Sequence, residues 1–186
     1  MKKIIVILTL FAISSIYAQE NDSLNSVISA SVRAVTPIGI FAKNWNTGTA
    51  YYLSYGWVFS DEWGVDFQVG YNKYRLKTNS NYSVPKLSML AFQVGGRYYF
   101  LNGSVKPYAV ILSGINYIRL YYKSNDILVD EREVHMNFQL GAGLNVDLFN
   151  NFQLEVSGLY NSHLINPSIP YNLTGIEYGF GINWTF

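Results

Sequence analysis

The sequence YGFGINWTF, residues 178–186, ends the chain and indicates its type of fold. Large apolar residues, most of them aromatic, occupy every second position, and small or polar residues stand between them. The large set is Tyr178, Phe180, Ile182, Trp184 and Phe186, and the small set is Gly179, Gly181, Asn183 and Thr185. Alternate residues of a β-strand point to opposite faces of the sheet. This stretch therefore predicts a strand that is bulky on one face and small on the other.

The same alternation runs through most of the chain beyond residue 26. In 134–148, for example, Val134, Met136 and Phe138 share an apolar face, while His135 and Asn137 share a polar one. No stretch of comparable length has the spacing of a helix. The pattern predicts eight strands, at residues 27–36, 48–59, 63–74, 87–100, 105–122, 133–148, 152–161 and 174–186.

The connections between these strands alternate between long and short. The long ones are 37–47, 75–86, 123–132 and 162–173, and the short ones are 60–62, 101–104 and 149–151. An antiparallel up-and-down sheet places its long loops at one end and its tight turns at the other. An even number of strands leaves both termini at the tight-turn end. We therefore predict an all-β protein, an eight-stranded antiparallel up-and-down barrel.

The first residues have the features of an export signal. Lys2 and Lys3 precede an apolar run of about ten residues, and the following stretch, Ser14 to Ala18, ends on the small residue that a signal peptidase needs. The run is too short for the roughly 20 residues of a membrane-spanning helix. We predict a signal peptide over 1–18 that is cleaved near Ala18, a short periplasmic segment over 19–26, and a barrel over 27–186.

Composition limits the classes of function. The chain has 13 basic and 12 acidic residues, so loss of Lys2 and Lys3 leaves 11 against 12 and a net charge of −1, which gives no indication of nucleic-acid binding. There is no cysteine for a disulfide scaffold or a thiolate metal site. Charged residues make up 13% of the chain and aromatic residues 17%, where about 25% charged is typical of soluble proteins.

The distribution of aromatic residues indicates which face of the sheet meets lipid. The polar face is mainly Gly, Ser, Ala and amide, which suits a crowded interior better than a soluble surface. Aromatic residues gather at both ends of the strands, as at the two interfaces of a membrane. One belt is Trp57, Phe59, Trp63, Tyr98, Phe100, Phe149, Phe152, Trp184 and Phe186, and the other is Trp45, Tyr51, Tyr71, Tyr74, Tyr117, Tyr121, Tyr160 and Tyr178. We predict a transmembrane barrel with its apolar face outward.

With these features the chain resembles the small outer-membrane β-barrel proteins of the OmpX, OmpA-barrel and OmpW kind. The stretches TPIGIFAKNWNTGTAYYLSYGWVF (36–59) and VKPYAVILSG (105–114) and the terminal aromatic strand carry the resemblance. It implies a location in the outer membrane of a Gram-negative-type bacterium, among its lipids. It also implies that the barrel-assembly machinery reads the terminal strand, with Tyr178, Trp184 and Phe186 as the signal.

An eight-stranded barrel is only wide enough to hold its own side chains, so charges inside it should be paired. Asp66 and Arg97 lie on neighbouring strands at similar height and should form one pair. Arg33 and Glu177 lie on the first and last strands and should form another. Asp147 and Glu155 flank one tight turn, where we expect them to face periplasmic water. We favour a structural role for these charges over an ion path.

Catalytic and metal sites have weak support in the sequence. His163 and Glu177 resemble part of the His-x-Ser-Asn element and acid of lipid A deacylase barrels, but Ile165 stands where that element has Ser. Ser162 is adjacent to the histidine and should point the other way. His135 and His163 stand far apart in the sequence. We therefore predict no catalytic residue, no metal and no cofactor.

Two features suggest how the protein acts. Strand 105–122 is apolar on both faces, which leaves its orientation open. We favour a bulge with ordinary packing as the explanation, and the alternative is an apolar patch in the lumen that would suit passage or binding of a small hydrophobic molecule. The strands at 105–122 and 133–148 exceed the roughly 9–11 residues that span a membrane, so their connection should project as a hairpin. Its apolar residues are Ile127, Leu128 and Val129. We predict a monomer that acts through surface contact or envelope integrity, with the hydrophobic ligand as the alternative.

Overall fold

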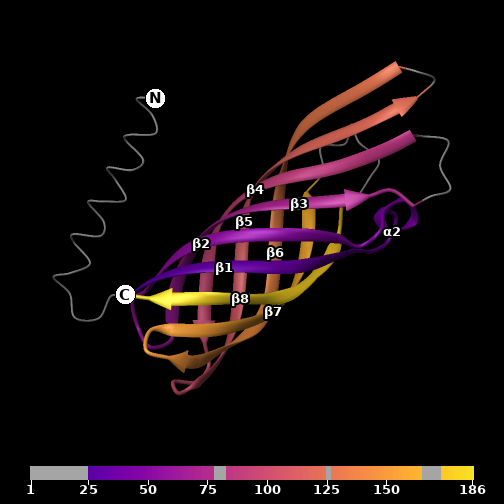
Figure 1. Ribbon diagram of the computed structural model, residues 1–186. Helices are drawn as coiled ribbons and strands as arrows, with labels where there is room; N and C mark the ends of the chain where they lie inside the picture. Colours follow the sequence, from indigo (N-terminus) through magenta and orange to yellow (C-terminus); the bar gives the residue numbers. More distant parts are fainter. Residues whose placement is uncertain (1–24, 78–82, 125–126, 165–172) are drawn as a thin grey trace.

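The computed structural model describes residues 25–77, 83–124, 127–164 and 173–186 and forms a closed eight-stranded barrel (Figure 1). All neighbouring strands are antiparallel, and β1 pairs with β8 to close the barrel. The strands are β1 (Asn25–Pro37), β2 (Gly48–Val58), β3 (Trp63–Arg75), β4 (Ser83–Tyr99), β5 (Val105–Ser124), β6 (Ile127–Phe149), β7 (Phe152–Leu164) and β8 (Gly175–Thr185). The predicted fold class is confirmed. The predicted signal peptide and its cleavage near Ala18 lie outside the described residues.

The largest difference from the predicted strands is in the β5–β6 hairpin. Residues 123–132, expected as a long loop, mostly continue the two strands, and the pairing reaches Ser124 opposite Ile127. The ends of β4, β5 and β6 accordingly extend furthest from the C-terminus (Figure 1). The sequence pattern did not reveal this strand, because successive residues such as Asp130, Glu131 and Arg132 are all exposed and no apolar alternation is required there. At the other end, Asn25 and Ser26 belong to β1 and not to the predicted periplasmic segment.

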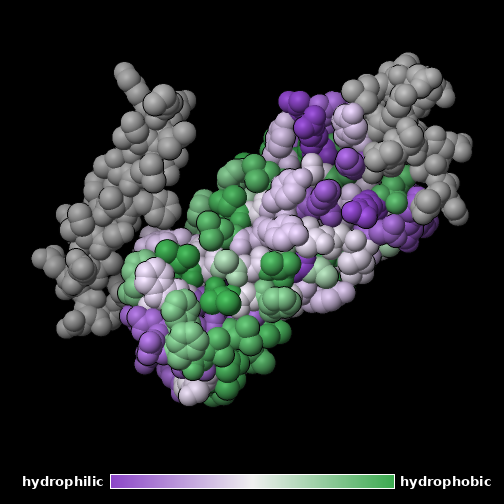
Figure 2. All heavy atoms as spheres, viewed as in Figure 1, coloured by the Kyte–Doolittle hydropathy of each residue, from purple (hydrophilic) through white to green (hydrophobic). Residues whose placement is uncertain are grey.

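Apolar side chains cover the outside of the barrel and small or polar ones fill the inside. On β8, Phe180 and Ile182 are exposed while Glu177 and Asn183 are fully buried. Figure 2 shows apolar residues gathered on the part of the barrel nearer the C-terminus and hydrophilic ones toward the projecting strands. Inward glycines make room for rings: a Cβ at Gly70 would collide with the ring of Tyr52. The small face of the alternation is therefore the crowded lumen.

A band of aromatic rings surrounds the tight-turn end of the barrel. Ring contacts with centroid distances of 4.8–6.5 Å join Phe149, Phe152, Trp184, Phe186, Tyr55 and Trp57, and a second group joins Trp63, Tyr98 and Phe100. The chain's last residue completes this band, because the backbone of Phe186 pairs with Ser26 on β1 and its ring reaches Tyr55 on β2. The predicted belt at this end is confirmed.

A one-turn helix, α2 (Phe41–Asn44), lies at the long-loop end (Figure 1). Phe41 is 2% exposed and packs edge-on against Tyr74, with 5.1 Å between ring centroids. Tyr74 and Trp45, which we assigned to the outer aromatic belt, instead belong to this internal cluster. Backbone bonds hold the helix in place, since Lys77 N donates to Asn44 O at 2.9 Å. No helix among the described residues has the length and apolar character to cross a membrane.

Candidate functional site

A network of charged side chains occupies the middle of the lumen. Arg97 Nε lies 2.8 Å from Asp66 Oδ2, and Arg33 NH1 lies 3.7 Å from Glu177 Oε2, so the structure places the residues of both expected pairs together. Glu155 joins the pairs, because its carboxylate is 3.2 Å from Arg97 NH1 and 3.9 Å from Arg33 NH2. Two guanidinium groups thus hold three carboxylates.

The expectation that Glu155 faces periplasmic water is wrong. Glu155 is 2% exposed and points into the lumen, where the two arginines compensate for its loss of water. Closeness to a turn along the strand does not fix depth in a barrel, because tilted strands bring residues of different strands to the same level. Asp147 does meet water: its side chain is 40% exposed and pairs with Lys106 at 3.4 Å.

Neutral polar groups surround the most deeply buried carboxylate, that of Glu177. Tyr52 donates its hydroxyl to this carboxylate at 3.1 Å, Gln139 Nε2 donates at 3.0 Å and Asn161 Nδ2 at 2.7 Å. Gln68 extends the network from Gln139 on β6 to Gln93 on β4. These bonds cross the lumen from wall to wall, which fills its middle with side chains.

The inner face of β5 resolves the orientation that the sequence left open. Val110 and Leu112 point inward and pack with Tyr99, Tyr108 and Leu159 beside the charged network, since Val110 is the cross-strand partner of Arg97. Further along the strand, Ile118 joins the cluster beneath α2. The outer face of β5 is also apolar, with Ile111, Ile115 and Tyr117 exposed. The strand is apolar on both faces because one meets lipid and the other meets these two clusters.

The two histidines lie together, contrary to our expectation that they are far apart. On the β6–β7 ladder Asn137 is opposite His163, so His135, two residues away on the same face, is its diagonal neighbour. Asn116 Nδ2 donates to His163 Nε2 at 2.8 Å, and His135 Nε2 donates to Glu133 Oε2 at 2.7 Å. The register of β6 and β7 brings the two histidines close together, and their spacing in the sequence does not predict this.

Among the described residues, these histidines have no partner that would make a hydrolase or a metal site. His163 is buried in the lumen, whereas Ser162 lies on the opposite face of β7. The Glu177 carboxylate contacts Arg33, Tyr52, Gln139 and Asn161. In the part of the chain that the structure describes, no group of three or more His, Cys, Asp or Glu side chains could hold a metal ion.

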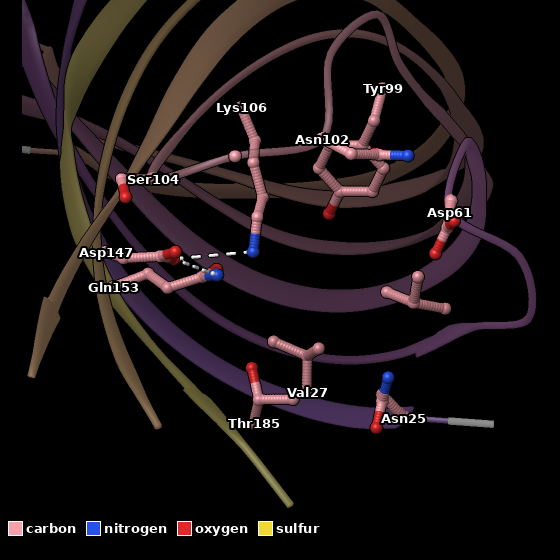
Figure 3. A pocket seen from close by; sticks show the side chains of 12 residues that line it. Asn25, Val27, Asp61, Tyr99, Asn102, Ser104, Lys106, Asp147, Gln153 and Thr185 are labelled. Carbon is pink, nitrogen blue, oxygen red and sulfur yellow. Dashed lines mark hydrogen bonds and ion pairs between the residues drawn. The ribbon is translucent and has the colours of Figure 1, made fainter. Parts of the chain in front are cut away.

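A cavity of about 520 Å³ opens at the tight-turn end of the lumen. Lys106, Asp147 and Gln153 meet on one side of it, with Tyr99 and Asp61 opposite (Figure 3). Gln153 Nε2 donates to Asp147 Oδ1 at 2.8 Å. Sequence reasoning missed this cavity because its lining comes from the tight turns and from β1 and β8, which meet only when the barrel closes.

Comparison with known proteins identifies the family. Residues 6–186 match the family described as outer membrane protein beta-barrel domain. The chain belongs to this family. The resemblance noted in the sequence is thus confirmed, and the family places this barrel in the outer membrane, where tight turns face the periplasm and long loops the exterior. A search of curated proteins finds no match.

Solved structures share the fold of this outer-membrane barrel at low sequence identity. Neisserial surface protein A is 16% identical, with a TM-score of 0.57 over 89% of this chain and 98% of its own. Ail of Yersinia pestis, in complex with the heparin analogue sucrose octasulfate, is 17% identical, with a TM-score of 0.58 over 88% and 99%. OprG of Pseudomonas aeruginosa is 14% identical, with a TM-score of 0.56 over 87% and 95%.

At the long-loop end, the β5–β6 extension is held by a charged clamp. Arg119 donates from Nε and NH2 to the two carboxylate oxygens of Asp130 at 2.8 and 2.9 Å, and Arg132 NH2 donates at 3.0 Å. The hydrogen bond from Arg119, followed by that from Arg132, lowers the pKa of Asp130 from 3.8 to about 2. The backbone of the predicted contact residues Ile127, Leu128 and Val129 lies on β6, and their side chains are outside the described part.

Proposed function

We propose that this protein is a non-enzymatic outer-membrane barrel with a filled lumen, which acts by contacting a partner outside the cell through the β5–β6 hairpin. The observation that carries the proposal is the projecting sheet edge of β6. The pairing of β7 with β6 ends at Leu164 opposite Met136, whereas β6 begins at Ile127. Among the described residues, no strand pairs with 127–135 on the side away from β5.

A free strand edge can accept another strand. Its unpaired N–H and C=O groups bind extended peptides by strand addition, and charged side chains at the edge limit indiscriminate pairing. Glu131, Arg132 and Glu133 supply such charges here. The clamp at Asp130 holds the hairpin in extended form, which lowers the entropy cost of binding. An extended peptide is therefore the partner that this surface fits best.

The side chains that fill the described part of the lumen support the proposal. The charged network crosses its middle, and Phe41 is buried with Tyr74 toward its outer end. Ail, which shares the fold, is called an attachment invasion locus protein and was solved with a heparin analogue. That description concerns Ail, and for this chain a surface contact is the proposal.

The test compares three proteins on the surface of a strain that lacks the native gene. The first is the wild type, the second joins Tyr121 to Val134 by Asn-Gly, and the third, as a control, replaces residues 78–82 by Asn-Gly. Binding to immobilised extended peptides and to sulfated polysaccharides is measured, with conductance in planar bilayers. Loss of binding in the hairpin variant alone supports the proposal. Equal binding by all three proteins, or stable conductance by the wild type, overturns the proposal. If no protein binds a ligand and the deletion strain is sensitive to detergent, the protein acts in envelope integrity.

A small hydrophobic ligand is the second candidate, supported by the apolar inner face of β5. Val110 and Leu112 are 5% and 3% exposed, and side chains already fill the clusters that contain them, so a ligand must displace packed groups. Binding of an apolar fluorescent probe that is abolished in Leu112→Asn but retained in Ile111→Asn, on the outer face, would favour this function over surface contact. Lipid A modification is disfavoured, because His163 and Ser162 lie on opposite faces of β7.

A further inference from the structure

We propose that the outer face of β3 and β4 binds phosphate groups of outer-leaflet lipids through Lys73, Arg75 and Lys86, which we call the basic strip. All three side chains are exposed on the outer face of the barrel. Arg75 and Lys86 are direct cross-strand partners, and Lys73 precedes Arg75 by two residues on the same face. Three cations from two strands thus converge on one small area.

In the described part of the chain, no carboxylate offsets the repulsion between Arg75 and Lys86, whereas one does so for a similar pair of cations. Arg119 and Arg132 are also direct cross-strand partners, but Asp130 lies between them and bonds to both. No described carboxylate is within ion-pair distance of Arg75 or Lys86. Like charges directly opposite each other destabilise a sheet. An external anion would relieve this repulsion, as Asp130 relieves the repulsion between Arg119 and Arg132.

The sequence around the basic strip cannot supply the missing carboxylate. From residue 67 to residue 125 there is no Asp or Glu, while eight residues are Lys or Arg. This span includes β4, the part of β3 from Phe67 onward and the whole β3–β4 connection. The outer faces of β7, β8 and β1, by contrast, carry no charged residue in their described parts. The positive charge is thus confined to one side of the barrel.

The height of the strip matches lipid head groups. A strand crosses the hydrocarbon in about 9–11 residues, and Lys73 and Arg75 stand 10 and 12 residues beyond Trp63, the first residue of β3. Directly below the strip, Tyr71 and Leu90 are exposed cross-strand partners on the lipid-facing surface. The cations therefore begin where the apolar surface ends.

Phosphate is the anion that this setting favours. Head-group phosphates are at that level of the membrane, and guanidinium and ammonium groups bind them by charge-assisted hydrogen bonds. Basic side chains next to an anionic membrane surface each add about fivefold to binding. Phosphorylated lipid of the outer leaflet, rather than a soluble anion, is thus the ligand we assign to the basic strip.

The experiment measures lipid retained by the refolded full chain in neutral detergent micelles that contain traces of bisphosphorylated lipid A or its dephosphorylated form. The test variant is Arg75→Gln with Lys86→Gln. The matched control, Lys43→Gln with Lys106→Gln, removes the same charge from exposed or half-buried sites away from the strip. A second variant, Ser88→Glu, adds a carboxylate directly opposite Lys73 on the β3–β4 ladder.

We expect the wild type and the control to retain phosphorylated lipid equally, and the double variant to retain roughly 25-fold less. The Ser88→Glu variant should also retain less phosphorylated lipid than the wild type. The urea concentration at its unfolding midpoint should be unchanged or higher. Equal retention by wild type and double variant, or equal retention of dephosphorylated lipid, overturns the proposal. It is also overturned if inorganic phosphate displaces the lipid at millimolar concentration, because the strip would then be a site for the free anion.

Discussion

Replacing Arg97 tests the charged network of the lumen. Arg97→Ala leaves Asp66 and Glu155 without their shared cation, and their side chains are only 16% and 3% exposed. Removing one partner of a buried ion pair costs about 3–5 kcal/mol. Arg97 also stacks over the ring of Tyr108, 4.2 Å from its centroid, so truncation removes that contact as well. We expect a loss of unfolding free energy in the upper part of this range.

The structure predicts which second mutation restores stability. Asp66→Asn should recover only a part of the loss, because Glu155 remains charged in the lumen with Arg33 at 3.9 Å as its remaining cation. Glu155→Gln should recover more, since it neutralises the more buried carboxylate. Both together should recover most of the loss, as expected when buried charges are replaced by neutral groups.

The assay is urea unfolding of the refolded barrel in phospholipid vesicles, followed by tryptophan fluorescence. Lys106→Ala is the control, because it breaks the more exposed Lys106–Asp147 pair and should cost about 0–1 kcal/mol. Strictly additive effects in the double mutants would show that these groups do not interact. If Asp66→Asn alone restored the full unfolding free energy, Glu155 would be shown not to take part in the network.

Three further predictions concern the chain end and the hairpin. Phe186→Lys should greatly reduce the yield of folded protein in the outer membrane, and a normal yield would refute its role in the assembly signal. Joining Tyr121 to Val134 by Asn-Gly should leave insertion intact, measured by protease resistance in membranes; failure to insert would make the hairpin part of the fold. The Asp130 carboxylate should titrate by NMR near pH 2, because the hydrogen bonds from the two arginines lower its pKa from 3.8 to about 2. The stability that the clamp adds is complete above pH 3.8 and is lost as the pH falls through about 2. Arg119→Gln should raise the titration midpoint, and an unchanged midpoint would contradict the clamp.

The sequence by itself determined the class of fold, the number of strands and the face that meets lipid. These follow from local rules: period-two alternation assigns each side chain to a face, and loop lengths assign each connection to an end. The terminal strand from Tyr178 to Phe186 shows this directly, since its bulky residues are on the outer surface and its small ones in the lumen. Where both faces meet water, as in the extension around Asp130, the rule gave no signal and the strands were predicted too short.

Only the tertiary structure decided which inward residues meet. Glu155 joins Arg33 to Arg97, and His135 lies beside His163, although neither neighbourhood follows from sequence spacing. The same is true of Arg75 and Lys86, which the β3–β4 register places face to face. Alternation is a property of single strands, whereas these contacts depend on strand tilt, register and closure, which bring together residues from different strands only when all eight have paired.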